Sequence, residues 1–180
     1  MVSSVEYKLK IINMKKILLL ITFAVFLSCE TKTVEVNTQV GKALYGDQNK
    51  LYAGNMDYAK ASVDVLKAYA DGNFDLIMEK MADTVSFFPD KGGELVTLVN
   101  PFNDFLASMQ EPYDSLTRGA YNVTSISTGL EGSSTIISVP FTEIRYLKDG
   151  SVERERVFER FIFNSEGKIR RVNKWTAELD

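Results

Sequence analysis

Residues 134–177 decide the fold: STIISVPFTEIRYLKDGSVERERVFERFIFNSEGKIRRVNKWTA. Their side chains alternate between apolar and polar with a period of two, which is typical of β-strands that bury one face. Asp149-Gly150 is a strong signal for a tight hairpin turn, and residues 164–167 predict a second turn. An antiparallel meander is therefore expected, with one further strand before it. The predicted strands of this part cover residues 121–127, 134–147, 152–163 and 168–177, and an earlier strand is predicted at 84–88, where Pro89-Asp90 ends it.

Pro140 lies inside the longest of these predicted strands. Proline has no N–H to donate, so within a sheet it is confined to an edge or to a bulge. We therefore expect the strand to bend at this residue.

The chain before the meander favours helices. From Met56 to Ala70, apolar residues recur at helical spacing and predict an amphipathic helix. Asn73 suits the cap of a second, shorter helix, and Asn100-Pro101 predicts the start of a third. Because the helices come early and most strands late, the sequence predicts an α+β domain. In this domain a curved antiparallel sheet wraps about three N-terminal helices.

The N-terminal segment has the features of an export signal. Lys15 and Lys16 precede the apolar run Ile17–Leu27, and Ser28-Cys29 follows. A charged start, a short apolar run and a small residue before the cut describe a signal peptide. The run is too short to span a bilayer. We expect cleavage of the chain before Cys29, which is the only cysteine in the sequence. We also expect this cysteine to carry covalently attached lipid, including palmitate.

An uncut membrane anchor with an incidental Cys29 is the alternative interpretation. Residues 1–13 resemble an upstream extension from a mis-set start codon before Met14. The residue after Cys29 is Glu30, not the aspartate that often retains lipoproteins at the inner membrane. We therefore expect the protein at the outer membrane, on either its periplasmic or its surface face. The predicted segments are a signal peptide at 1–28, the lipidated cysteine with a flexible tether at 29–51, and a folded domain at 52–180.

The composition narrows the available chemistry. The chain has no histidine and a formal net charge of −3. A net acidic protein argues against nucleic acid as a partner. The absence of histidine excludes nucleophilic catalysis by Ser-His or Cys-His pairs. It also removes the usual metal ligand, so no metal or cofactor is expected. Any catalysis would use Asp or Glu as the general base.

Basic and acidic residues are interleaved near the end of the chain. This pattern is typical of a solvated strand face with cross-strand ion pairs. The residues concerned are Arg154, Arg156, Arg160, Arg170 and Arg171, with Glu153, Glu155 and Glu159.

Two stretches resemble nuclear-transport-factor-2-like (SnoaL-like) domains. They are residues 69–76, YADGNFDL, and residues 81–89, MADTVSFFP, while Gly167-Lys168-Ile169 and Trp175 are similar to the family's last hairpin. The resemblance covers roughly residues 52–179 and implies a cone-shaped α+β fold with a pocket between helices and sheet. The family includes ketosteroid isomerase, scytalone dehydratase, polyketide cyclases and non-catalytic binding or dimerising domains, so the fold does not choose the function.

Six residues are candidates for the pocket wall. They are Phe87, Phe105, Phe141, Glu143, Tyr146 and Trp175. Simple core packing is the alternative for each aromatic residue. Phe141 and Tyr146 are an odd number of positions apart, so only one of them can face inward unless a bulge intervenes. Trp175 is the preferred wall residue, and strand alternation places it on one face with Ile169.

Two carboxylates are considered for chemistry. A turn at Asp149-Gly150 would place Glu143 opposite Arg156, and such a pairing lowers a carboxyl pKa and makes a poor base. Glu143 is therefore interpreted first as a structural ion pair, with binding and catalysis as alternatives. The resemblance places Asp83 where the family has an acidic residue before the first strand, and a turn residue is the alternative. No catalytic residue is assigned.

Two hypotheses for function remain. The first is a membrane-anchored, non-catalytic domain that binds a small apolar ligand or a partner protein; a homodimer stays open. The second is an acid-base enzyme of the isomerase, cyclase or dehydratase type that uses a pocket carboxylate. A pocket carboxylate with a raised pKa beside a tyrosine would favour the enzyme.

The lipoprotein hypothesis predicts that Cys29→Ala abolishes lipid attachment and maturation, because the thiolate takes up the lipid. Incorporation of radiolabelled fatty acid into the variant and the wild type measures this directly. Label that is still incorporated by the variant would contradict the assignment.

Overall fold

The computed structural model describes residues 39–42, 50–90, 93–129 and 134–178. The chain divides into residues 1–36 and 37–180, and all described residues belong to the second unit. The predicted signal peptide and Cys29 lie outside the described residues. No helix of the described residues is long and apolar enough to cross a membrane.

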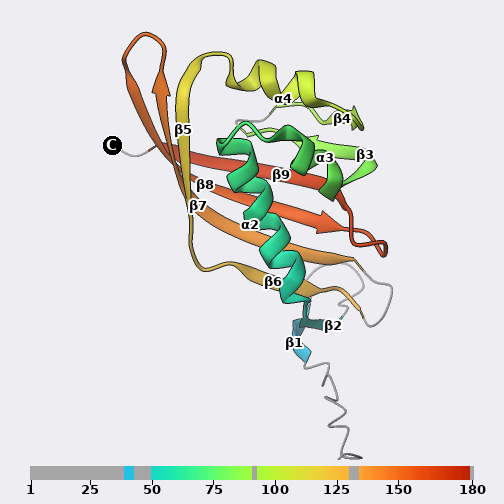
Figure 1. Ribbon diagram of the computed structural model, residues 1–180. Helices are drawn as coiled ribbons and strands as arrows, with labels where there is room; N and C mark the ends of the chain where they lie inside the picture. Colours follow the sequence, from blue (N-terminus) through green and yellow to red (C-terminus); the bar gives the residue numbers. More distant parts are fainter. Residues whose placement is uncertain (1–38, 43–49, 91–92, 130–133, 179–180) are drawn as a thin grey trace, which may run out of the picture. The chain divides into compact units, whose positions relative to one another are not determined.

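The described residues of this unit form three helices and a nine-stranded sheet (Figure 1). The helices are α2 (Met56–Ala70), α3 (Phe74–Lys80) and α4 (Asn103–Gln110). The strands are β1 (Gln39–Lys42), β2 (Lys50–Ala53), β3 (Met81–Phe88), β4 (Val96–Val99), β5 (Tyr113–Ala120), β6 (Thr124–Ser127), β7 (Thr135–Leu147), β8 (Val152–Phe163) and β9 (Ile169–Glu178).

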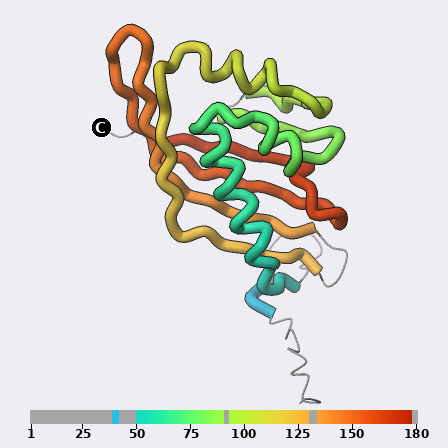
Figure 2. Tube along the Cα trace, in the orientation of Figure 1, coloured from blue at the N-terminus to red at the C-terminus, as the bar shows by residue number. Residues whose placement is uncertain are grey.

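The strands form one sheet in the order β1-β2-β6-β7-β8-β9-β3-β4, with β5 paired to β7 beside β6. All pairs are antiparallel except β3 with β9. The helices cover one face of this curved sheet, and α2 runs across β7 and β8 (Figures 1 and 2). The predicted α+β class and helix-covered, curved sheet are confirmed.

Helix α2 has the predicted bounds because its end signals are local. The Asn55 side chain accepts a hydrogen bond from the Asp57 N–H at 2.7 Å, and Gly72 has the positive φ of 69° that follows many helices. Asn73 caps α3 as expected, accepting from the N–H of Leu76. The two polar caps therefore fix where α2 and α3 begin.

The predicted cap of the third helix is wrong. Helix α4 begins at Asn103, and its N-cap Phe102 offers no side-chain hydrogen bond. Asn100 instead donates through Nδ2 to the carbonyl of Met78 at 3.0 Å. Its side chain therefore joins the segment before α4 to α3, and the helix begins later than the sequence suggested.

Strands β1, β2, β4 and β5 lie where no strand was predicted from periodicity. Strand β1 falls within the predicted tether and pairs with β2. Strand β5, with the sequence YDSLTRGA, has only one buried residue and no clean alternation. It is held by its pairing with β7, a long-range interaction that a local pattern does not encode.

Pro140 lies at a change of neighbours rather than at a free edge. On one side of β7, residues 135–138 pair with β6 and residues 141–147 pair with β5. Pro140 falls in the gap between these ladders, where its carbonyl accepts from the N–H of Tyr121. The missing N–H of proline therefore costs no ladder bond.

The predicted pairing of Glu143 with Arg156 is wrong by one residue. Strand β8 places Glu155 opposite Glu143, and Arg156 opposite Thr142. The loop has three residues rather than two, because the N–H of Leu147 bonds to the carbonyl of Ser151. A three-residue loop with a glycine in the left-handed region is a common hairpin, and Gly150 has a φ of 86°.

A bulge in β9 overturns the predicted position of Trp175. Phe163 pairs with Ile169, whereas the adjacent Ile162 pairs with Arg171, so Arg170 is an extra residue. After this extra residue, each side chain of β9 points to the opposite face from the one that simple alternation predicts. Lys174, rather than Trp175, therefore shares the inner face with Ile169. Trp175 is 47% exposed and packs on the outer face against Phe158.

The alternation of β8 separates its charges between the two faces. Glu155 and Glu159 are buried on the helix-covered face, while Arg154 and Arg156 are exposed on the other. The prediction of a solvated face is therefore wrong for these two glutamates, although Glu155 does form a cross-strand ion pair, with Arg145 of β7. Their burial gives the inner face an acidic character that the sequence pattern did not reveal.

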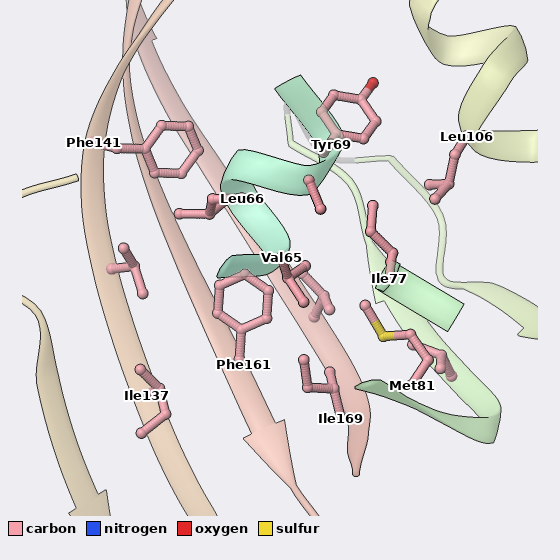
Figure 3. Close-up of a cluster of buried hydrophobic side chains, with 14 of the residues drawn as sticks. Val65, Leu66, Tyr69, Ile77, Met81, Leu106, Ile137, Phe141, Phe161 and Ile169 are labelled. Carbon is pink, nitrogen blue, oxygen red and sulfur yellow. The ribbon is translucent and has the colours of Figure 1, made fainter. Parts of the chain in front are cut away.

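The core lies between α2 and the inner face of the sheet (Figure 3). Val65 and Leu66 of α2 face Phe141 and Phe161 of the sheet, while Ile77 of α3 closes one side. These side chains are almost completely buried. Burying a side chain of this size contributes roughly 1.5–3 kcal/mol, so this contact holds the helix on the sheet.

We predict that Phe163→Ala lowers the free energy of unfolding by about 3–5 kcal/mol. Phe163 is fully buried, and its ring stacks on Tyr58 with centroids 4.6 Å apart. The control Tyr146→Ala removes a ring that is 42% exposed and should cost below about 1 kcal/mol. Urea unfolding of both variants is the measurement, and equal losses would contradict this description of the core.

Candidate functional site

A partly open cavity of about 80 Å³ lies between the helices and the inner face of the sheet. A buried water needs roughly 10–15 Å³ on this measure, and a cavity of about 150 Å³ holds benzene, so the space suits a few waters or a small molecule. Its apolar wall comes from β3, β4, β8, β9 and the three helices. The apolar wall includes Val65, Leu66, Ile77, Met81, Val85, Phe87, Leu98, Phe102, Phe105, Leu106, Met109, Phe161 and Val172.

Four polar residues complete the cavity wall. They are Tyr69 from α2, Arg118 from β5, Glu159 from β8 and Lys174 from β9. Since β5, β8 and β9 are close neighbours in the sheet, these strands bring together residues far apart in the chain. The cavity therefore has one polar side within an apolar surround, the usual arrangement of a small-molecule site.

Glu159 is the most unusual member of this set. It is only 6% exposed, and its side chain makes no hydrogen bond or ion pair with any residue that the structure describes. Burial raises the pKa of its carboxyl group; Arg118 and Lys174 act against this rise, and Glu143 and Asp90 add to it. The neutral, protonated form is thus favoured more than in an ordinary glutamate.

Lys174 lies directly opposite Glu159 across the β8–β9 ladder. Its side chain is 11% exposed, and its Nζ is 3.9 Å from Oε1 of Glu143. This distance allows an electrostatic attraction but exceeds a hydrogen bond. Within the described part of the chain, the ammonium group therefore has no hydrogen-bond acceptor.

Glu143 forms a buried ion-pair network with two arginines. Arg118 Nε donates to its Oε2 at 2.6 Å, and Arg145 Nε donates to its Oε1 at 2.7 Å. Burial alone would raise the carboxyl pKa of Glu143, but Arg118, Lys174 and Arg145 together hold it below its ordinary value. A carboxylate held in this way is a poor base.

The two arginines of this network are committed to protein partners. Arg145 also donates to Oε2 of Glu155 at 2.5 Å. The Arg118 guanidinium carbon lies 4.2 Å from the ring centroid of Tyr69 and 5.1 Å from that of Phe141. Such cation–π contacts fix its orientation. Arg118 therefore forms part of the wall without a free carboxylate-binding geometry.

Tyr69 supplies a hydroxyl group at the cavity wall. The residue is 8% exposed, and burial raises the pKa of its phenol to about 12, although the charge of Arg118 acts to lower it. The phenol therefore stays protonated at neutral pH and remains able to donate a hydrogen bond. Figure 3 shows Tyr69 at the end of α2, on the side nearest Leu106 of α4.

The six candidates from the sequence occupy different places. Phe87 and Phe105 line the cavity, and their ring centroids are 6.2 Å apart. Phe141 and Glu143 are buried beside the cavity, in the core and the ion-pair network. Tyr146 is 42% exposed, and neither it nor Trp175 belongs to the cavity wall.

Asp83 lies elsewhere. It is exposed and borders a polar surface hollow, which it shares with Asn100, Lys168 and Arg170. Apolar side chains do not surround it, so the structure gives this carboxylate no buried environment. Asp83 lies within strand β3, so the turn-residue interpretation is wrong, and it does not belong to the cavity wall either.

Sequence reasoning missed the polar residues of the cavity. A signal for Glu159 was present, because Val157, Phe161 and Phe163 share its parity and predict a buried face. Lys174 gave no such signal, since its inward position depends on the bulge at Arg170. Tyr69 was noted only as part of the helix.

The sequence matches no protein-family model and no curated protein. Solved structures are nevertheless similar. One is the epoxide hydrolase/cyclase-like enzyme SalBIII, which has a role in pyran ring formation in the polyether salinomycin. It is 13% identical in sequence with a TM-score of 0.56, and the match covers 68% of this chain and 92% of that enzyme. Another is a nuclear-transport-factor-2-like protein of unknown function from Exiguobacterium sp. 255-15. It is 14% identical with a TM-score of 0.51, and the match covers 64% of this chain and 99% of that protein.

A proposed dehydratase of the same family from Streptomyces avermitilis has 12% identity and a TM-score of 0.53 over 66% of this chain and 92% of its own. Similarity at such low identity concerns the backbone arrangement and not the chemistry. Each match covers nearly the whole length of the neighbouring structure, so the similarity includes both the curved sheet and its helices. The described domain therefore has the nuclear-transport-factor-2-like fold.

Proposed function

We propose that this domain binds a small, largely apolar molecule in the cavity, with Glu159 as the polar contact. The observation that carries the proposal is the carboxyl group of Glu159, which makes no hydrogen bond with the described residues and lies on the polar side of a largely apolar cavity. Its oxygens are not among the described buried polar atoms that lack a partner, so they open onto the cavity. A ligand in the cavity can therefore supply the hydrogen bond that the protein does not.

The rest of the wall suits an apolar body. Phe105, Leu106 and Met109 of α4 face the sheet across the cavity, and Phe87 adds a ring from β3. The small volume excludes a drug-sized molecule, whose sites occupy roughly 300 Å³ or more, unless α4 moves. A ring or a short aliphatic chain fits this space.

The proposal includes a membrane anchor. The sequence around Cys29 supports lipid attachment there, at the outer membrane of the cell envelope. The domain would then sample ligands close to the membrane surface.

An acid-base enzyme is the second candidate, and a specific observation favours it. Glu159 is a cavity carboxyl group with a raised pKa, and the phenol of Tyr69 lies on the same wall. A carboxylic acid that stays protonated near neutral pH can give a proton to a substrate oxygen. The similar fold of SalBIII, an epoxide hydrolase/cyclase-like enzyme, is compatible with this role.

We predict that p-cresol and toluene both bind the purified domain, with p-cresol the tighter ligand because its hydroxyl meets Glu159. Chemical-shift changes of amides in α4 and β8 measure both affinities. Glu159→Leu should remove the advantage of p-cresol, whereas Glu166→Leu, in an exposed turn, should keep it. Leu106→Trp should block both ligands by filling the cavity. The proposal fails if neither ligand shifts these amides.

The variant Glu159→Gln separates the two candidate functions. Glutamine keeps the size and the hydrogen-bonding ability of the side chain but cannot transfer a proton. A binding domain keeps its affinity for p-cresol in this variant. An enzyme keeps substrate binding but loses turnover by at least about a hundredfold, the usual contribution of an acid or base.

We also predict a pH dependence of stability. The unfolded chain releases the Glu159 proton near its ordinary pKa, whereas the folded protein holds it to higher pH, so wild-type stability falls as pH rises between these values. Each unit of pKa difference corresponds to about 1.4 kcal/mol. The stability gained by Glu159→Gln should therefore grow in urea unfolding as the pH rises above the ordinary glutamate pKa of about 4. A constant difference would show that folding does not raise the pKa of Glu159.

A further inference from the structure

We infer that the outer face of the sheet docks on a membrane surface that carries anionic lipid headgroups. The outer face is the face of β7, β8 and β9 that lies away from the three described helices (Figure 1). It lies opposite the cavity, so this inference does not depend on the ligand of the proposed function. It follows from the charges and the aromatic side chains at the outward positions of these strands.

Four arginines occupy outward positions of this face. Arg154, Arg156 and Arg160 alternate along β8, and Arg171 follows on β9. Among the described residues, none of the four forms a salt bridge, and Arg171 donates a hydrogen bond only to the neutral Asn173. No carboxyl group occupies an outward position in the described parts of β7, β8 and β9. The outer face therefore carries uncompensated positive charge, although the whole protein is net negative.

The negative charge of the same strands lies on the inner face. Glu143, Glu153 and Glu155 all form salt bridges with Arg145, which is itself an inward residue of β7. Glu159 also lies on that face. Because the two faces of the sheet differ in charge, an anionic surface will orient the domain with its outer face inward to that surface.

An aromatic pair lies between the arginines. Trp175 is directly opposite Phe158 in the β8–β9 ladder, their ring centroids are 5.7 Å apart, and Trp175 is 47% exposed. The Arg160 guanidinium carbon lies 5.6 Å from the Trp175 ring centroid, and its Nε has no hydrogen-bond partner in the described structure. Tryptophan favours the headgroup layer of a bilayer, and guanidinium groups bind phosphate in a bidentate manner. Both residue types therefore suit the same interfacial layer.

An anionic membrane fits the outer face better than a second copy of this chain. A second copy would bring the same four arginines opposite one another with no carboxylate between them, and like charges across an interface are unfavourable. An apolar partner would remove water from the guanidinium groups without replacing it. A layer of lipid phosphates meets all four arginines at once. The proposed lipid on Cys29 would keep the domain beside such a layer, but the argument from charge does not require it.

The experiment uses residues 37–180, a compact unit that contains the described sheet and its core and omits Cys29. Sedimentation with vesicles measures the affinity, either for phosphatidylcholine alone or for equal parts of phosphatidylcholine and phosphatidylglycerol. We expect binding to the phosphatidylglycerol vesicles alone, and we expect salt to weaken it. Trp175 is the only tryptophan, so its emission should shift to the blue and resist iodide quenching when these vesicles are added.

The double variant Arg154→Ser/Arg156→Ser should weaken vesicle binding about thirtyfold, because each cation near an anionic surface contributes roughly fivefold. Both arginines are exposed and unpaired in the described structure, so their loss should leave the fold intact. The matched control is Lys60→Ser/Lys67→Ser, which removes the same charge from exposed positions on α2. Because these lysines lie on the helix side, the control should change the affinity by less than about twofold.

Three results would overturn the inference. The first is equal binding to the two kinds of vesicle, or binding to neither. The second is equal weakening by the two double variants, which would show attraction to overall charge rather than to the outer face. The third is a dimer in sedimentation equilibrium whose Trp175 is shielded from iodide without lipid, because a second copy would then cover this face. Binding of p-cresol in the cavity is measured without lipid, so each of these results leaves the proposed function standing.

Discussion

Strand β8 places successive side chains on opposite faces of the sheet, and the buried charges of the domain depend on this alternation. One face carries Glu155 and Glu159 beneath the helices, and the other carries Arg156 toward solvent. Burying carboxyl groups is costly unless cations accompany them. The neighbouring strand β7 meets this requirement for Glu155 through Arg145. Glu159 has Lys174 of β9 as its cross-strand neighbour, but no ion pair joins the two. The cavity wall thus inherits its polarity from one strand.

The ion-pair network around Glu143 gives the polar side of the cavity a fixed geometry. It joins β5 to β7, and the Arg118 guanidinium group continues the contact to Tyr69 of α2. Buried ion pairs are weak evidence for stability, because desolvation offsets most of their attraction. Their effect here is to hold a wall in place, which lowers the ordering cost when a ligand enters.

The sequence predicted those parts of the fold that depend on local signals. Helix α2 and strand β8 have the expected bounds because capping residues, turns and periodicity lie within a few residues of their ends. The errors arose where one residue changes a register, at the three-residue loop before Ser151 and at the bulge at Arg170. The cavity could not be predicted, since its shape depends on how α4 packs. Glu159 was interpreted as solvated because charged residues surround it in the chain.

The bulge at Arg170 also has an evolutionary consequence. Deletion of this single codon would restore regular alternation in β9 and would exchange the positions of its last residues across the sheet. The indole of Trp175 would then enter the space that Lys174 now borders, and the ammonium group would move to solvent. A one-residue change would thus convert an open cavity into a filled core without altering the backbone topology, and every strand and helix would be retained.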